Sequence, residues 1–438
     1  MNTTKPSKFL AILAAIVGGL LLLGGCSAAV GYLGLPLVIS TKNVLTAQLG
    51  QIAAIFLGLV SGGLAFWHGL ASLLGRPSRP LKLPPAYLFW ILFALTLGLG
   101  NLLLATHVAE AYLFPLLFLL SATLPTGAAL AFAYRRLGWP VTWRQAALIL
   151  AAGSTLSIAI AILLEGFLPY LYYLLIKPLG YLVKEFLSIL SPGGPEMLER
   201  LFFSPLLVFF FLYIALQAPL PEEFAKALGP AFMGRRIQNE RQAFAVGLAS
   251  GAGFAILENM LYEGLYAHLS GWSWGGITLL RGIGAVNHSL WTAIIALALF
   301  RERERKPGWF GRILRAYLLS VLLHTLWNGG FEAFVYLTGL DYYAGLGPSL
   351  SVYGLYIEVL LVVFLAVLSA GMWWLLRRYI IQLGKEVQPD LIPVRITRRA
   401  LAGWALACAL VIIPIGAALG PAWNAIRAML VGAIIPAP

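Results

Sequence analysis

Eleven apolar runs of about 18 residues or more follow one another along the chain, and each is long enough to cross a bilayer as a helix. Only helices and closed barrels satisfy their backbone polar groups in lipid, and runs of this length favour helices. We therefore expect an all-α protein, a polytopic membrane bundle of about eleven transmembrane helices. The predicted spans are 9–34, 45–74, 84–106, 110–134, 145–168, 202–225, 243–263, 279–300, 313–337, 352–376 and 400–420.

Composition agrees with a membrane location. Of the 438 residues, 60% are hydrophobic and only 11% are charged, whereas soluble domains carry roughly 25% charged residues. These values exclude a soluble globular enzyme and a disordered chain. The net charge of +13 is spread in short basic clusters between apolar runs, which favours a membrane orientation signal over a nucleic-acid surface. Cys26 and Cys408 lie far apart and provide neither a disulfide framework nor a cysteine-based zinc site.

The basic residues also predict the orientation of the chain. With the N-terminus in the cytoplasm, 24 of the 30 Lys and Arg side chains fall in cytoplasmic segments, as the positive-inside rule requires. We expect a multi-pass integral protein of a bacterial plasma membrane, with the C-terminus outside. The stretch 164–200 is the least regular and could hold an interfacial helix. The sequence Leu23-Gly24-Gly25-Cys26 leaves a lipoprotein signal as an alternative for the first span, but the apolar run continues to Ile39.

The expected division of the chain follows the polar residues found inside spans. Residues 1–200 form an N-terminal bundle of about five spans with an outer loop, 201–340 form a core of four spans, and 341–438 hold two C-terminal spans. Of the 17 carboxylates, all but three lie in loops, at span ends or near a membrane surface. The three exceptions are Glu222, Glu223 and Glu258, and an ionisable group at membrane depth indicates a functional site.

The segment from Pro219 to Lys226 is the sharpest local feature. Two prolines within three residues, Pro219 and Pro221, interrupt the helix here and predict a water-filled cavity beside the two glutamates. Lys226 is placed i+4 from Glu222 and i+3 from Glu223, so it can neutralise one of them. The other is then a candidate general base.

Two histidines lie inside spans, and each is followed three residues later by a tryptophan, as in His288–Trp291 and His324–Trp327. Neutral imidazoles that hydrogen-bond between packed helices are the structural alternative. Amides stand close to each ionisable group, since Asn259 follows Glu258, Asn287 precedes His288, and Asn328 is i+4 from His324. Small residues before Glu258, at Gly247, Ser250, Gly251 and Gly253, would let helices approach closely.

In this order, Glu222-Glu223-x-x-Lys226, Phe254-x-x-x-Glu258-Asn259, His288-x-x-Trp291 and His324-x-x-Trp327-Asn328 resemble the PrsW family of intramembrane proteases. That family is related to CAAX-processing-type membrane proteases, which usually carry His where this chain has Glu258. The resemblance covers about residues 202–337. It implies an endopeptidase that cleaves membrane-protein substrates within the bilayer, single-span or anti-sigma-factor-like, and it implies no nucleic-acid partner.

The residue types suggest the roles in such a reaction. Glu222 or Glu223 is the expected general base, His288 and His324 bind the oxyanion or donate a proton, and Glu258 orients a histidine or shares a proton. The expected supporting residues are Lys226, Asn259, Asn287, Asn328, Trp291 and Trp327. We expect a glutamic-type protease without a cofactor, but His288, His324 and Glu258 also form a complete catalytic zinc set. A proton-coupled transporter and a non-catalytic scaffold of the same fold compete with the protease interpretation.

Overall fold

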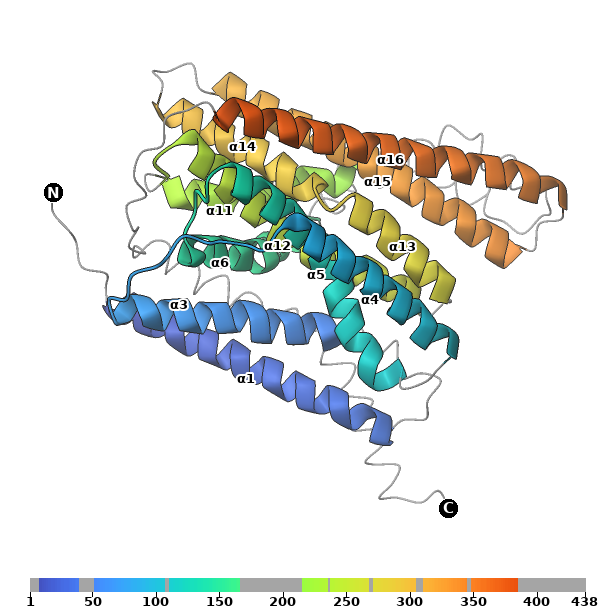
Figure 1. The fold of residues 1–438 in the computed structure, drawn as a ribbon, viewed down its shortest axis with the longest axis horizontal. Coiled ribbons are helices and arrows are strands. Elements are labelled where there is room, and N and C mark those ends of the chain that lie inside the picture. Colours follow the sequence, from blue (N-terminus) through green and yellow to red (C-terminus); the bar gives the residue numbers. More distant parts are fainter. Residues whose placement is uncertain are drawn as a thin grey trace, which may run out of the picture.

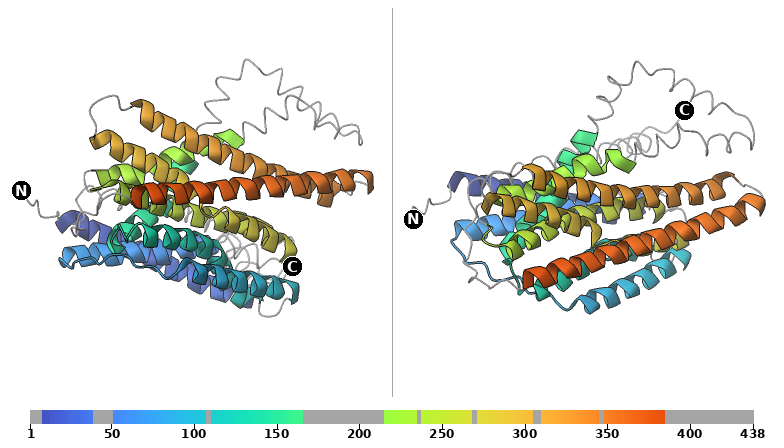
Figure 2. Two further views of the ribbon diagram at one scale, coloured as in Figure 1. Left: turned by 45° about the horizontal axis from the view of Figure 1, so that its top comes forward. Right: turned by 90° about the horizontal axis from the view of Figure 1, so that it is seen from above.

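The chain folds into a bundle of long helices that run in roughly the same direction (Figure 1 and Figure 2). This computed structural model describes residues 8–38, 51–106, 110–165, 215–234, 237–267, 271–304, 310–344 and 348–384. Within these ranges there is no strand, only an isolated bridge between Pro80 and Thr142. The expected all-α class is confirmed.

The elements are numbered along the chain as in Figure 1. They are α1 (Lys8–Val38), the π-helix η1 (Phe56–Gly62), α3 (Gly63–Leu73), α4 (Ala86–Thr106), α5 (Glu110–Arg136), α6 (Trp143–Ala152), the π-helix η2 (Gly153–Ser157), α11 (Pro219–Met233), α12 (Glu240–Ala267), α13 (Gly271–Ile283), α14 (Asn287–Glu304), α15 (Phe310–Ala344) and α16 (Pro348–Gly384).

Seven helices among the described residues are long and apolar enough to cross a membrane. They are Gln51–Leu73, Ala86–Thr106, Leu113–Arg136, Trp143–Glu165, Glu240–Gly264, Trp274–Glu304 and Val359–Gly384. The predicted number of eleven is therefore not confirmed. Predicted spans 9–34 and 313–337 correspond to α1 and α15, which are helical but are not among the seven. Span 400–420, most of span 202–225 and most of the stretch 164–200 lie outside the described residues.

Helix α12 lies at the centre of the bundle and is almost completely buried. It packs on α5, α6, α11, α13 and α14, and its glycines permit this close packing. A Cβ atom added to Gly251 would overlap the backbone carbonyl of His288 on α14, and one added to Gly253 would overlap the carbonyl of Leu150 on α6. The expected close approach of helices at these small residues is confirmed.

Helices α4 and α16 lie at the outside of the bundle (Figure 1). Many of their exposed side chains are large and apolar, as expected for surfaces in contact with lipid tails. On α4 these are Leu88, Ile91, Leu92, Leu95, Leu99 and Leu102, and on α16 they are Val359, Leu360, Val363, Val367, Trp374 and Ile381. Helices α1 and α3 lie side by side and form a separate pair at the lower edge of the same view.

Among the described residues, the helices are interrupted before α11 and between α13 and α14, whereas the sequence predicts only the first of these interruptions. The predicted interruption is present, since α11 begins at Pro219 after a turn at Ala218, and the Tyr317 hydroxyl donates a hydrogen bond of 2.7 Å to the carbonyl of Leu220. The second separates α13 from α14 at residues 284–286, inside the predicted continuous span 279–300. It occurs where Gly284 packs against Trp327 so closely that an added Cβ would overlap the indole ring.

Described residues next to the basic clusters contact one another at one end of the bundle. Arg301 pairs with Glu240, Arg303 donates to the carbonyl of Ile237 at 2.8 Å, and Arg241 donates to the carbonyl of Leu383 at 2.7 Å. At this end, the N–H of Leu81, before α4, donates a hydrogen bond of 2.9 Å to the carbonyl of Val141, before α6. Both side chains are buried in the same hydrophobic cluster. If successive spans alternate in direction, these segments must lie at the same end of the bundle.

Which side of the membrane this end faces is a testable prediction. Because Lys and Arg accumulate in cytoplasmic loops, reporter fusions at Arg236, Arg305 and Lys385 should give cytoplasmic signals. Fusions at Gly193, Ser270 and Gly345 should report the outside. A cytoplasmic signal at Ser270 would contradict the orientation, because Arg236 precedes α12 and Ser270 follows it, so the two must lie on opposite sides of the membrane.

Candidate active site

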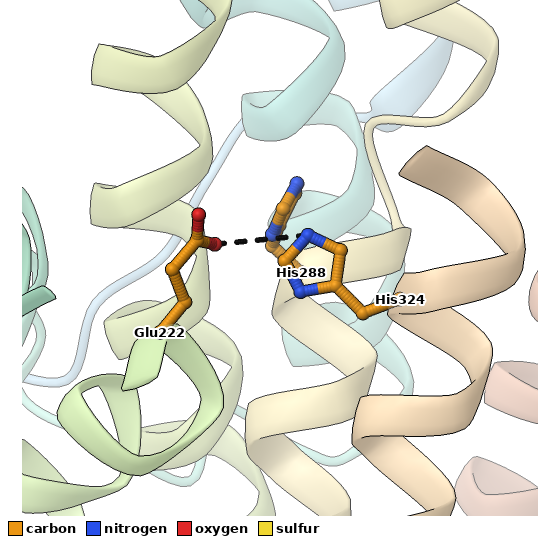
Figure 3. A group of neighbouring side chains, drawn as sticks. All are labelled: Glu222, His288 and His324. Atoms are coloured by element: carbon orange, nitrogen blue, oxygen red, sulfur yellow. Dashed lines mark ion pairs between the residues drawn. The ribbon is translucent and has the colours of Figure 1, made fainter. Parts of the chain in front are cut away.

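Four helices bring the predicted ionisable residues together in the interior of the bundle. Glu222, Glu223 and Lys226 come from α11, Glu258 from α12, His288 from α14 and His324 from α15, and none is more than 7% exposed. Figure 3 shows Glu222, His288 and His324 pointing toward one another from their separate helices. The five residues expected to act in the reaction therefore lie in one cluster with Lys226.

Lys226 lies in the middle of this cluster and is fully buried. Its Nζ atom is 2.7 Å from Glu223 Oε1, 3.2 Å from Glu222 Oε2 and 3.0 Å from His288 Nδ1. The ring centroid of Phe254 lies 4.2 Å from Nζ, so the ring covers the ammonium group on another side. The sequence predicts that Lys226 neutralises one glutamate, but the ammonium group contacts both.

His324 contacts both glutamates of α11. Its Nδ1 atom lies 2.9 Å from Glu223 Oε1, and its Nε2 atom lies 3.6 Å from Glu222 Oε2, the pair marked by the dashed line in Figure 3. A distance of 3.6 Å is too long for a direct hydrogen bond. His324 Nε2 is fully buried and has no hydrogen-bond partner among the described residues.

His288 is held from two sides. Its Nε2 atom lies 2.7 Å from Glu258 Oε2, while its Nδ1 atom lies 3.0 Å from Lys226 Nζ. Lysine can only donate, so Nδ1 is the acceptor in that contact and Nε2 carries the proton that faces Glu258. Both ring nitrogens of His288 therefore have a charged neighbour within 3.0 Å.

The two tryptophans have different surroundings. Trp291 stacks on His324 with ring centroids 4.6 Å apart and planes inclined by 26°, and the two histidine rings meet edge to face at 4.8 Å. Trp291 thus fixes the ring of the histidine on the neighbouring helix. Trp327 is also buried, but its indole packs on Gly284 at the interruption between α13 and α14.

The three predicted amides are all buried, and they differ in their partners. Asn259 accepts a hydrogen bond of 2.8 Å from Arg281 Nε, so it belongs to a neighbouring contact and not to the histidines. Asn287 is fully buried, and neither atom of its amide group has a hydrogen-bond partner among the described residues. Asn328 lies one turn beyond His324 on α15.

Two buried charged residues beside the cluster are not predicted by the sequence. The basic-residue pattern places Arg281 in an outer segment, but it lies in α13 and is only 2% exposed. Glu263 is expected at a span end, but it is 1% exposed and accepts a hydrogen bond of 2.6 Å from Ser121. A single arginine in the apolar run from Trp274 to Val286 is the signal that could have found this group, since such a residue requires a partner from another helix.

Comparison with known proteins agrees with this arrangement. Residues 140–368, somewhat more than half of the chain, match the sequence model described as PrsW family intramembrane metalloprotease. The chain belongs to the PrsW family. The match contains all four motifs and extends back to α6, and it makes the chain an intramembrane protease whose substrates are membrane proteins. No curated protein and no solved structure matches the chain.

The family description raises the question of whether the site fits a metal ion. Glu222, His288 and His324 offer ligand atoms that all lie within 4.8 Å of one another, and two imidazoles with a carboxylate are a donor set typical of catalytic zinc. The sequence predicts Glu258 as the carboxylate of this set. In the structure, Glu258 Oε2 faces His288 Nε2, and Glu222 is the carboxylate that lies close to both histidines.

The arrangement around Lys226 does not fit a metal ion. The ammonium group occupies the lone pair of His288 Nδ1, and His288 Nε2 lies 2.7 Å from Glu258 Oε2, so a metal ion on His288 Nδ1 would have to displace the ammonium group. Nζ also lies 3.2 Å from Glu222 Oε2, so a metal ion on that oxygen would lie within about 5 Å of a positive charge in a low-dielectric interior. As arranged, Glu222 and His288 contact the ammonium group of Lys226, while His324 lies beside Glu222.

Proposed function

We propose that this PrsW-family protease is of the glutamic type and that Glu222 activates the water that hydrolyses the peptide bond. The separation of 3.6 Å between Glu222 Oε2 and His324 Nε2 carries this proposal. A water molecule beside these two atoms could donate one hydrogen to each of them, because polar atoms that are too far apart for a direct contact are commonly bridged by water. Its oxygen lone pairs would then remain free to attack a carbonyl carbon.

Glu222 suits the role of general base better than Glu223. Glu223 is fully buried, and its Oε1 atom is engaged by both Lys226 and His324. Glu222 is 7% exposed, contacts Lys226 at the longer distance of 3.2 Å and faces the gap to His324. We therefore assign Glu223 to the orientation of His324 and Lys226, a role that carboxylates commonly fill behind catalytic imidazoles.

The reaction that we propose balances without a cofactor. The water oxygen forms a bond to the scissile carbonyl carbon while a water proton passes to Glu222, and the C–N bond then breaks as that proton moves to the leaving amine. His288, whose Nε2 carries a proton, and the amide groups of Asn287 and Asn328 are the candidates to stabilise the negative charge on the carbonyl oxygen, because His324 Nε2 accepts a hydrogen bond from the water. Glu258 orients His288 from the opposite side.

The proposed substrates are single-span or lipid-anchored membrane proteins, such as anti-sigma-factor-like proteins already shortened outside the membrane. A peptide bond inside a helix keeps its carbonyl shielded by the hydrogen bond of the next turn. A segment that is extended or locally unwound at membrane depth can present its carbonyl to the cluster. This favours substrates with helix-breaking residues near the cleavage site.

Cleavage by purified protein in the presence of a chelator tests the proposal. In liposomes with a fluorogenic transmembrane peptide, we expect cleavage to persist after chelation and the zinc content to stay far below the roughly one equivalent of a structural or catalytic metal site. About one equivalent of zinc together with loss of cleavage on chelation would contradict the glutamic mechanism. Absence of any cleavage would contradict the proposal altogether, with proton-coupled uptake then favouring a transporter and its absence a scaffold.

A further inference from the structure

Arg281 is a buried cation that the proposed reaction does not yet use. It lies in the last turn of α13, is 2% exposed, and has its Nη2 atom 3.1 Å from Glu258 Oε2. The same Glu258 oxygen lies 2.7 Å from His288 Nε2. Arg281, Glu258 and His288 therefore form a continuous chain of charged and polar contacts that ends in the cluster.

The charges of the cluster indicate why a second cation is needed. A carboxylate buried at membrane depth is stable as an ion only when it is paired. Lys226 pairs with Glu222 and Glu223, the two glutamates of its own helix. Arg281 is the cation that pairs with Glu258, which allows Glu258 to face His288 as a carboxylate.

The surroundings of Arg281 also hold it in place. Its Nε atom donates a hydrogen bond of 2.8 Å to Asn259 Oδ1 on α12, and its guanidinium group lies 4.7 Å from the ring centroid of Tyr262 and 5.6 Å from that of Phe331. These contacts connect the end of α13 to α12 and α15. The guanidinium group is thus fixed by two neighbouring helices, which is the condition for orienting a partner precisely enough to matter for catalysis.

The position of Arg281 relative to the second helix interruption adds a geometric effect. The helix ends two residues after Arg281, at Ile283, and α14 begins at Asn287 immediately before His288. Residues 284–286 form a short hydrogen-bonded turn, in which Gly284 N–H donates to the carbonyl of Leu280 and Asn287 N–H to that of Gly284, so the end of α13 is coupled directly to the start of α14. Contacts that fix the end of α13 against α12 therefore also limit where His288 can lie.

We propose that Arg281 is a positioning residue of this active site, which keeps Glu258 charged and directed at His288 and fixes the start of α14. The inference rests on the proposed hydrolysis. Arg281 acts through Glu258 and not on the substrate, so its loss should slow the chemical step and leave substrate binding nearly unchanged. A purely structural arginine would instead reduce the amount of folded protein without changing kcat per folded molecule.

A double-mutant cycle of Arg281 and Glu258 tests this inference. We expect Arg281→Gln to lower kcat about 10²-fold with little change in KM, since a small misplacement of a catalytic group has effects of this size. The double variant Arg281→Gln/Glu258→Gln should have the kcat of Glu258→Gln alone, because residues that act as a unit are strongly non-additive. Arg281→Lys, which keeps the charge, should recover part of the loss.

The pair Arg312 and Glu302 provides a control ion pair outside the cluster. Arg312 Nε lies 3.2 Å from Glu302 Oε1 at the opposite end of α14, and Arg312→Gln and Glu302→Gln should leave kcat unchanged. If Arg281→Gln fails to accumulate because Glu258 is left unpaired, the double variant removes both charges and still permits the kcat comparison with Glu258→Gln.

Three outcomes would overturn the inference. Additive losses of kcat in the double variant would mean that the two residues act separately, and an unchanged kcat in Arg281→Gln would mean a structural role. A change confined to KM would indicate substrate binding. If the wild type cleaves and Glu222→Gln does not, any of these results contradicts the role of Arg281 alone, whereas a wild type that does not cleave contradicts the proposed function and the inference with it.

Discussion

Replacing Glu222 with glutamine is expected to lower kcat by about 10²–10⁴-fold while the protein accumulates and folds normally. Glutamine keeps the shape of the side chain but cannot take a proton from water. Glu222 is the least engaged carboxylate of the cluster, so the loss of its charge still leaves Lys226 paired with Glu223 at 2.7 Å. The measurement is single-turnover cleavage of a fluorogenic transmembrane peptide by purified protein in liposomes.

Glu223→Gln should differ from Glu222→Gln in its effect on stability. Glu223 is in contact with both Lys226 and His324. Its replacement removes the carboxylate that lies closest to the buried ammonium group and the carboxylate that orients His324. We expect lower activity together with a lower thermal unfolding temperature, because Lys226 keeps only the longer contact with Glu222 at 3.2 Å and His324 loses the carboxylate partner of its Nδ1 atom. Glu222→Gln should lower activity alone.

Glu302→Gln is the matched control for both variants. Glu302 is as buried as Glu222, at 8% against 7% exposed, and it pairs with Arg312 away from the cluster. Its replacement should leave the cleavage rate within about twofold of the wild type. Equal cleavage by Glu222→Gln and wild type would exclude Glu222 as the base, and a selective loss in Glu223→Gln would then transfer that role to Glu223.

Much of this site could be predicted because membrane insertion makes polar residues conspicuous. An ionisable side chain in an apolar run has few explanations, so Glu222, Glu223, Glu258, His288 and His324 could be selected from the sequence. Their order on successive spans then indicated the family, which the match over residues 140–368 confirms. The helix start at Pro219 could be predicted as well, because proline lacks the N–H that continues a helix.

Other features could not be predicted because they depend on which helices are neighbours. Arg281 has no acidic residue within a turn in the sequence, and its partners Glu258 and Asn259 come from a different helix. The interruption before Asn287 lacks proline and lies where Gly284 packs closely against Trp327. Apolar periodicity gives the length of a run, but it does not detect a break that is stabilised only by contacts with another helix.

Lys226 shows the same limit for charge. Spacing along one helix predicts contacts with Glu222 and Glu223, and both are present. The contact with His288 Nδ1 at 3.0 Å comes from the packing of α11 against α14, and this contact decides whether His288 can bind a metal. The motif alone therefore does not show whether the positive charge in the cluster is the ammonium group of Lys226 or a metal ion.

Replacing Lys226 with methionine is expected to have the largest effect on stability. Methionine is similar in length and unbranched but carries no charge, so Glu222 and Glu223 would lose their common partner in the interior of the bundle. Removal of one partner from a buried ion pair lowers the free energy of unfolding by about 3–5 kcal/mol. Unfolding monitored by differential scanning fluorimetry in detergent measures this change, and Lys226→Met/Glu223→Gln should recover part of it by removing one unpaired charge.

Lys226→Met, which lowers stability, should raise the affinity of the site for a metal ion. Without the ammonium group, His288 Nδ1 regains a free lone pair next to Glu222 and His324, which together form a carboxylate and two-imidazole donor set. Lys226→Met should therefore bind added zinc with about one equivalent and be stabilised by it, as expected for a ligand that binds only the folded state. Wild type should do neither under the same conditions. Zinc bound to wild type in equal amount and lost in His324→Ala would show that the ammonium group does not exclude the metal, and the glutamic mechanism would have to be replaced by a zinc-dependent one.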